Sequence, residues 1–217
     1  MQILILGATG RTGKQLLQQA LHKGYTVHAL VRDKSRVSLA NSRLYLFEGT
    51  PNDLAAIEQA MQGCEAVLSV LNISRTSDFP WAGLRTPKDF LSDSINKVIA
   101  VCNKINCKRV IVVSAWGVNE TKKELPGWFR WVVDHSNVKY PYLDHGVVEN
   151  LLKASSLDWT IIRPAGLTNS SREKSVKVSF NADPKPGYTI SRRNVAKFML
   201  EALENRNFLR QSPTISS

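Results

Sequence analysis

The chain has 217 residues, of which 43% are hydrophobic and 22% charged, and it carries a formal net charge of +11 at pH 7. This composition excludes collagen-like, low-complexity and disordered classes of protein. Basic residues exceed acidic ones in both halves of the chain and form no basic tail, so we expect no nucleic-acid partner.

The cellular class follows from three features of the sequence. No apolar run approaches the length of a membrane-spanning helix, and Met1-Gln2 leads straight into an apolar segment instead of a secretory signal. The three cysteines (Cys64, Cys102, Cys107) do not make the even set of a disulfide framework, and no Cys or His spacing is typical of zinc. We therefore expect a cytoplasmic protein without a membrane partner or a metal.

Strand-like and helix-like segments alternate along the chain. The predicted strands are Gln2–Leu6, Thr26–Val31, Arg43–Phe47, Ala66–Leu71, Arg109–Ser114 and Trp159–Arg163. The predicted helices are Lys14–His22, Leu54–Met61, Lys88–Ile105, Tyr142–Ala154 and Asn194–Leu203. This alternation predicts right-handed βαβ units. The expected fold class is α/β, a Rossmann-like doubly wound parallel sheet with helices on both faces, built as a single domain over residues 1–217.

Two long loops interrupt the alternation, Asn72–Thr86 and Ala115–Pro141. Both follow predicted strands, and ligands of open α/β sheets bind at the carboxyl ends of the strands. We therefore expect these loops to form the ligand pocket. The aromatic residues of the second loop (Trp116, Trp128, Phe129, Trp131) form either a lid over a planar ligand or a short helix, Gly127–Val133, that buries its aromatic side.

The sequence GATGRTG, from Gly7 to Gly13, lies between the first strand and the first helix. In that position the glycines allow a tight turn, close approach of a pyrophosphate and close packing of the helix on the strand. The Lys-Ser/Thr pair of a P-loop is absent, because Lys14-Gln15 follows Gly13. The pattern predicts a dinucleotide cofactor rather than a nucleoside triphosphate.

The end of the second strand bears on the choice between NADP and NAD. Arg32 comes 22 residues after Gly10, Arg36 follows, and Arg11 lies within the glycine loop. Guanidinium groups suit a 2′-phosphate, whereas an acidic residue here binds a ribose hydroxyl. Asp33 is the candidate for that second role. We predict NADP (NADPH) as the cofactor, with NAD as the alternative.

Four segments resemble the atypical short-chain dehydrogenase/reductase group: GATGRTG, ALVRD at 29–33, LDWTIIRP at 157–164 and ISRRNVA at 190–196. Within that group the chain is most similar to NAD(P)H-binding proteins of the flavin reductase/biliverdin-IX-beta reductase type. The resemblance implies one Rossmann domain with NADP across the strand ends.

The resemblance also implies roles for individual residues. The glycine loop would hold the pyrophosphate and adenosine side, and Arg32 and Arg36 the 2′-phosphate. Ser114 and Pro164 would flank the nicotinamide. The family's Gly-Asp after the third strand is Gly49-Thr50 here, which leaves Asp53 as the nearby acidic residue for the adenine side. The complete set of predicted cofactor residues is Gly7, Thr9, Gly10, Arg11, Thr12, Gly13, Arg32, Arg36, Asp53, Leu71, Asn72, Ile73 and Pro164.

The proton-transfer pair of short-chain alcohol dehydrogenases, a tyrosine with a lysine four residues later, is broken. Position four after Tyr142 is Gly146 and after Tyr140 is Asp144, while alignment on the following helix puts His145 in the place of the lysine. Flavins and quinones accept a hydride with less help from an acid, so they suit this pattern. We predict Ser114 as a hydrogen-bond donor to the acceptor, His145 as a proton relay and Tyr142 as a further candidate acid.

Three hypotheses about function follow. The first is an NADPH-dependent reductase of a small planar acceptor such as a flavin or quinone. Biliverdin is not expected, because the family's histidine after the strand-six proline is missing from Pro164-Ala165-Gly166. The second is a non-catalytic NADP-binding redox sensor with a protein partner. The third is reduction or epimerisation of a specialised metabolite with Tyr142 or His145 as the acid. We expect a monomer or a weak homodimer.

Overall fold

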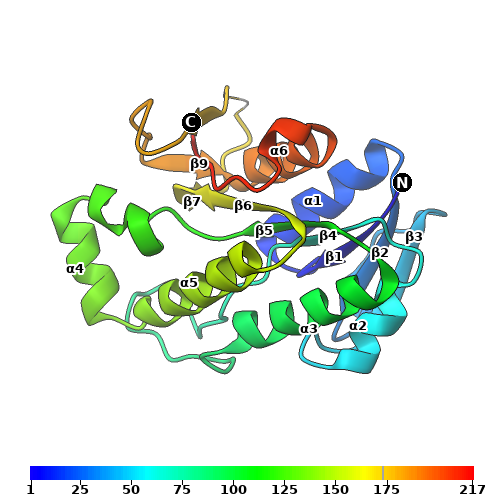
Figure 1. Cartoon of the computed structure of the whole chain (residues 1–217). Coiled ribbons are helices and arrows are strands. Elements are labelled where there is room, and N and C mark those ends of the chain that lie inside the picture. Colours follow the sequence, from blue (N-terminus) through cyan, green and yellow to red (C-terminus); the bar gives the residue numbers. More distant parts are fainter. Residues whose placement is uncertain (173) are drawn as a thin grey trace.

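The computed structural model describes residues 1–172 and 174–217, and its centre is an eight-stranded sheet (Figure 1). The strand order is β3-β2-β1-β4-β5-β6-β10-β8, and all these pairings are parallel except that of β8 with β10. The strands are β1 (Gln2–Leu6), β2 (Thr26–Val31), β3 (Leu44–Glu48), β4 (Ala66–Ser69), β5 (Arg109–Val113), β6 (Asp158–Pro164), β8 (Lys177–Ser179) and β10 (Thr214–Ser216). The first six have the order of a doubly wound dinucleotide-binding sheet, which confirms the predicted fold class.

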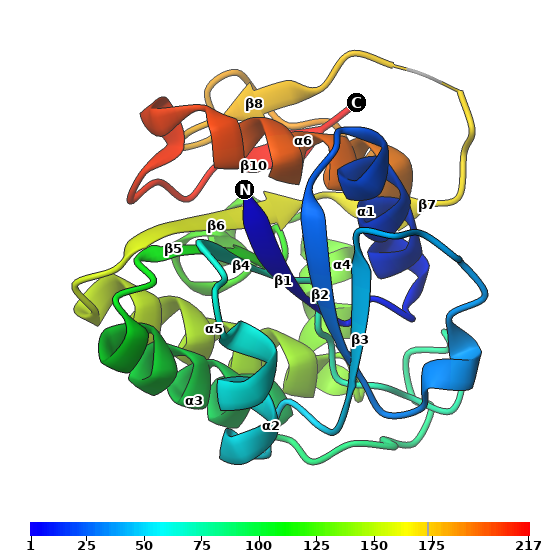
Figure 2. The ribbon, with the colours of Figure 1, turned by 90° about the vertical axis from the view of Figure 1, so that its right-hand side faces the viewer.

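Helices cover both faces of this sheet (Figure 2). One face carries α1 (Arg11–His22) and α6 (Arg192–Glu204), and the other carries α2 (Leu54–Met61), α3 (Phe90–Ile105) and α5 (Lys139–Ala154). Alternate residues of β1 enter opposite cores: Ile3 and Ile5 pack with α1 and α6, while Leu4 and Leu6 pack with α2 and α3. Burial on both sides explains why this strand is a continuous apolar run.

The segment expected to be the loop Ala115–Pro141 is largely helical. It contains the 3₁₀ helix η2 (Asn119–Glu124) and α4 (Gly127–His135), and α5 begins at Lys139, ahead of the predicted Tyr142. The prediction of a long loop here is therefore wrong in part, because the helix Gly127–Val133 that was one of the two alternatives is present as α4. Phe129 and Val133 of α4 pack on Trp116, and this small apolar cluster holds the helix in place.

The C-terminal third holds more strands than the sequence predicted. Besides β8 and β10, a separate parallel pair joins β7 (Gly166–Thr168) to β9 (Thr189–Ser191). Each of these four strands has three residues, too few to show a period of two. Two short 3₁₀ helices, η1 (Lys34–Arg36) and η3 (Arg206–Phe208), complete the described elements. None of the helices in residues 1–172 and 174–217 is both long and apolar enough to cross a bilayer.

Candidate functional site

The glycine loop connects β1 to α1 and brings three backbone segments into close contact. Gly7 has a φ of +85°, and a Cβ there would lie 3.2 Å from the carbonyl carbon and oxygen of Val70. A Cβ on Gly13 would lie 2.0 Å from the Gly7 carbonyl oxygen and 2.8 Å from Ala8 Cα. Only glycine fits at these two positions, and the resulting close packing of α1 on β1 is the feature that a bound pyrophosphate requires.

The amino end of α1 is open toward this loop. Gly10 is the N-cap residue, and no side chain of the described part of the chain caps the helix there. The first N–H groups of a helix lack internal acceptors and, with the helix dipole, favour a phosphate at this end. Thr9 and Thr12 lie half-buried beside it. The structure therefore offers a cradle that fits a dinucleotide pyrophosphate.

Arg11, predicted to reach a cofactor phosphate, is paired with a carboxylate. Its Nη1 and Nη2 donate to Asp78 Oδ2 and Oδ1 at 2.8 and 2.7 Å, and both side chains are exposed. This pair holds the pKa of Asp78 below its usual value. A phosphate approaching Arg11 would compete with Asp78, since a carboxylate and a phosphate use the same guanidinium fork.

Two arginines follow β2, and the acidic residue between them caps the 3₁₀ helix η1. Arg32 and Arg36 are exposed. The Asp33 carboxylate accepts from the Ser35 backbone N–H at 2.9 Å and from the Ser35 hydroxyl at 2.6 Å, which lowers the pKa of Asp33. Asp33 therefore caps η1, and its Oδ1 is already used by both Ser35 donors.

The remaining cofactor candidates have different surroundings. The Leu71 backbone N lies 3.3 Å from the position of a Cβ on Gly7, so the chain after β4 and the glycine loop are in close contact. Asn72 is exposed beside them, whereas Ile73 is buried in the core. The Asp53 carboxylate caps α2 by accepting from Ala55 N at 3.0 Å.

Ser114 follows β5, and its hydroxyl is hydrogen-bonded to a buried carboxylate. The hydroxyl donates to Glu149 Oε1 at 2.7 Å, and Glu149 is fully buried on α5. Arg163 of β6, also buried, donates from Nε to the same Oε1 at 2.9 Å and from Nη2 to Oε2. Asn119 Nδ2 donates to Oε2 at 3.0 Å. All of these partners donate to Glu149, and its contact with Arg163 is a buried salt bridge.

This network determines what Ser114 can do. A hydroxyl has one proton, and here that proton is directed at Glu149. Only the lone pairs of Ser114 Oγ remain for a ligand, so the side chain is arranged to accept a hydrogen bond. Ser114 could donate to the hydride acceptor, as predicted, only if its hydroxyl turned away from this buried carboxylate.

Tyr142 is similarly engaged. Its hydroxyl donates to the Trp116 carbonyl oxygen at 3.2 Å, and burial raises the pKa of Tyr142 to about 12. A general acid works best when its pKa is near the working pH, so this raised pKa makes the Tyr142 phenol a poorer acid near neutrality. Pro164 also contacts Trp116, whose backbone N–H donates to the Pro164 carbonyl oxygen at 3.0 Å.

His145 is buried on α5, and burial lowers its pKa to about 4, although Glu149 opposes that shift. The imidazole is therefore neutral at pH 7. It faces a cavity of about 10 Å³, near the size of one water molecule. The lining residues are Ser69, Leu71, Leu91, Ile95, Val112, Val113, His145 and Val148.

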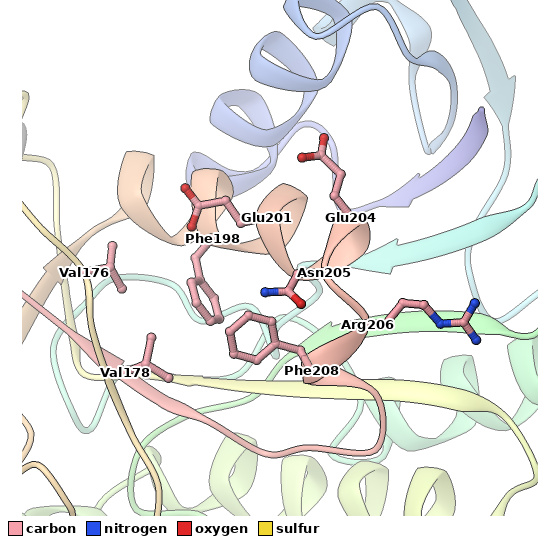
Figure 3. A pocket seen from close by; sticks show the side chains of 8 residues that line it. All are labelled: Val176, Val178, Phe198, Glu201, Glu204, Asn205, Arg206 and Phe208. Atoms are coloured by element: carbon pink, nitrogen blue, oxygen red, sulfur yellow. The ribbon is translucent and has the colours of Figure 1, made fainter.

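A second pocket lies well away from the glycine loop. It has a volume of about 650 Å³ and sits where α1 and α6 end, since Lys23, after α1, pairs with Glu204 of α6 at 2.8 Å (Figure 3). Its lining residues are Val176, Val178, Phe198, Glu201, Glu204, Asn205, Arg206 and Phe208. The glycine loop is at the other end of α1, so this pocket takes no part in the cofactor cradle. Within residues 1–172 and 174–217, no three His, Cys, Asp or Glu side chains gather as metal ligands would.

Sequence reasoning missed the roles of Glu149, Arg163 and Asp144. Asp144 is buried on α5 and accepts from the backbone N–H groups of Leu91 and Ser92 at 2.7 and 3.1 Å, so it caps α3 from a neighbouring helix. The available signal was Arg163, a charge within a strand predicted to be buried, since buried charges occur in pairs.

Comparison with known proteins agrees with this cradle. The model of the NAD(P)H-binding family matches residues 7–206. The chain belongs to this family. Its curated relatives include an oxidoreductase of Pestalotiopsis microspora, 29% identical over 93% of this chain and 79% of that protein. An uncharacterized sugar epimerase of Bacillus subtilis is 27% identical over 95% of this chain and 90% of that protein.

Solved structures show the same fold as this NAD(P)H-binding protein. A short-chain dehydrogenase/reductase from Veillonella parvula in complex with NADP superposes with a TM-score of 0.81 at 22% identity, covering 100% of this chain and 94% of that one. An anaerobilin reductase from Escherichia coli O157:H7 gives a TM-score of 0.81 at 18% identity, covering 100% and 97%. The predicted likeness to NAD(P)-binding reductases is confirmed.

Proposed function

We propose that this protein is an NADPH-dependent oxidoreductase that transfers a hydride to a small planar acceptor such as a flavin or quinone. The observation that carries the proposal is that none of the three predicted proton-transfer side chains is arranged as an acid. The proton of Ser114 goes to Glu149, that of Tyr142 goes to a backbone carbonyl, and His145 is neutral.

This arrangement bears on the choice of acceptor. Reduction of a ketone or aldehyde develops an alkoxide, which needs a proton from a positioned acid. A reduced flavin or quinone spreads its charge over conjugated atoms, so water can supply the proton. The nicotinamide, when bound, supplies the hydride, and the chain's own contribution is binding, orientation and exclusion of solvent.

The chain's residues would act in two groups. The glycine loop and the open end of α1 would hold the pyrophosphate, with Leu71 and Asn72 beside the ribose. Ser114 would accept a hydrogen bond from the nicotinamide amide or from a ligand N–H, since its own proton is directed at Glu149. Asp53 and Ile73 remain predicted contacts of this site, with Pro164 on the nicotinamide side.

The preference for NADPH over NADH is part of the proposal. Arg32 and Arg36 are exposed at the end of β2, where a 2′-phosphate lies in this fold. Both Ser35 donors use Oδ1 of Asp33, so a ribose hydroxyl would have to bind the other oxygen of a carboxylate that already caps η1. A Veillonella relative in fold binds NADP, which is in keeping with this choice. The buried thiols of Cys64, Cys102 and Cys107 agree with a reducing compartment, and we propose the cytoplasm.

Absorbance at the reduced-nicotinamide band measures turnover directly. We expect NADPH oxidation with FMN or a simple quinone and little with a ketone, and a loss of NADPH affinity of about tenfold in Arg32→Ala with NADH affinity unchanged. Lys34→Ala, a neighbouring exposed cation, is the matched control. Tight NADPH binding without turnover on any acceptor would favour the redox-sensor hypothesis instead.

A further inference from the structure

Four large aromatic side chains gather on one exposed surface to which the proposed function assigns no role. Trp128 and Trp131 of α4 are 71% and 56% exposed, and Phe79 and Trp81 of the loop before α3 are 62% and 47% exposed. We call these four residues the aromatic face. It lies at the end of the molecule formed by α4, far from β3 (Figure 1).

A hydrogen bond and two ring contacts join these side chains. The Trp81 indole N–H donates to the His135 carbonyl oxygen at 3.0 Å, and the His135 ring stacks on Trp131 at 4.9 Å between centroids. The ring centroids of Phe79 and Trp81 lie 5.4 Å apart. Trp128 is one turn of helix before Trp131, so the two side chains share a side of α4. The four residues therefore form a single surface.

The fold does not need this surface for its own core. Phe129 and Val133, on the other side of α4, already pack on Trp116 and Leu125. Trp128 and Trp131 remain outside, with no hydrogen bond of their indole N–H groups in the described part of the chain. The expectation of a helix that buries its aromatic side therefore holds for Phe129 and is wrong for the two tryptophans. Contiguous apolar surface of this kind marks a site of interaction.

Two arginines lie on the segments that carry the aromatic face. Arg75 Nη1 donates to the Phe79 and Pro80 carbonyl oxygens at 2.9 and 3.2 Å, which places a guanidinium at the loop. Arg130 is exposed between the two tryptophans in sequence. The neighbouring acid Asp134 is paired with Lys122 at 2.6 Å. The chain as a whole carries +11.

We propose that the aromatic face docks on the surface of an anionic lipid bilayer. Tryptophan beside arginine and lysine is the combination that occupies the headgroup region, because the indole is apolar with one polar N–H while the cations meet lipid phosphates. Each cation near such a surface adds attraction, and the apolar rings add insertion. The position of α4 at one end of the molecule lets it meet a plane (Figure 1).

Sedimentation with vesicles tests this directly and does not depend on turnover. The probes are vesicles of phosphatidylcholine alone and vesicles in which a quarter of the lipid is phosphatidylglycerol. We expect the protein to pellet with the anionic vesicles and not with the neutral ones. Trp128→Ala with Trp131→Ala lowers the partition coefficient by about tenfold, and salt weakens binding of the wild type.

The matched control removes two exposed apolar side chains elsewhere. Tyr45 of β3 and Leu54 of α2 are 52% and 44% exposed, and the double variant Tyr45→Ala with Leu54→Ala should bind vesicles like the wild type. Circular dichroism melting of both double variants checks that each is folded. Wild-type protein that stays in solution with anionic vesicles overturns the proposal, as does equal loss in the two double variants. A wild-type dimer that the tryptophan variant dissociates, without vesicle binding, assigns the face to a second copy instead.

Discussion

Replacement of Gly13 by alanine tests the packing on which the cofactor cradle depends. The added Cβ would lie 2.0 Å from the Gly7 carbonyl oxygen, where ordinary contact begins at 3.4 Å. The nearest atoms, in Gly7 and Ala8, belong to the backbone and cannot rotate away. The helix α1 must therefore move away from β1 by about 1.4 Å. Because α1 buries Leu16, Leu17, Ala20 and Leu21 against the sheet, this retreat loosens one whole core.

The expected cost is at the upper end of overpacking, about 3 kcal/mol. For a chain of this length that lowers the thermal midpoint by about 6–12 °C, and NADPH binding weakens with it. Differential scanning calorimetry and NADPH titration of the folded variant measure the two effects. Gly127→Ala is the control, since a Cβ there meets nothing within 4 Å and should change stability by less than about 0.5 kcal/mol. Equal midpoints for the two variants would refute the packing argument.

Three further predictions concern the buried groups of α5 and β6. Arg163→Met leaves the Glu149 carboxylate without its main partner and should lower the free energy of unfolding by about 3–5 kcal/mol. Adding Glu149→Leu should restore most of the lost stability, as measured by urea unfolding. No recovery in the double variant would contradict the ion-pair explanation. His145 has a pKa of about 4 when folded and 6.5 as a free side chain, so the unfolded chain binds the proton more readily between these values, and stability falls as pH drops from 6.5 toward 4, by up to about 3 kcal/mol. His145→Gln should remove this part of the pH dependence of unfolding, and an unchanged slope would count against it. Asp144→Ala removes the cap of α3 and should cost about 2 kcal/mol; a loss below that of the exposed Asp53→Ala cap of α2 would argue against its importance.

The sequence predicted those parts of the fold whose signal is local. The apolar run Gln2–Leu6 indicates a buried strand, because burial on both faces restricts its residues to apolar ones. The glycine loop after it indicates a dinucleotide cofactor, because its tight turn and close packing require glycine. The strands β7 to β10 were missed because each has only three residues, and their pairing depends on segments distant in sequence.

The chemistry of the site depended on partners that spacing cannot reveal. Ser114 meets Glu149, which lies 35 residues later, and Arg11 meets Asp78, which lies 67 residues later. Sequence analysis placed Ser114 at the end of a strand, but the direction of its proton follows only from the buried carboxylate beside it. The neutrality of His145 likewise depends on three-dimensional burial.

The pH dependence of kcat for NADPH oxidation with FMN shows whether water or a side chain protonates the reduced acceptor. We expect kcat to vary less than about threefold between about pH 6 and pH 9, since no group of the chain must be protonated for hydride transfer. The opposite result is a kcat that falls about tenfold per pH unit above a single apparent pKa in that range, together with loss of activity in Tyr142→Phe. That result would show that a side chain, and not water, supplies the proton.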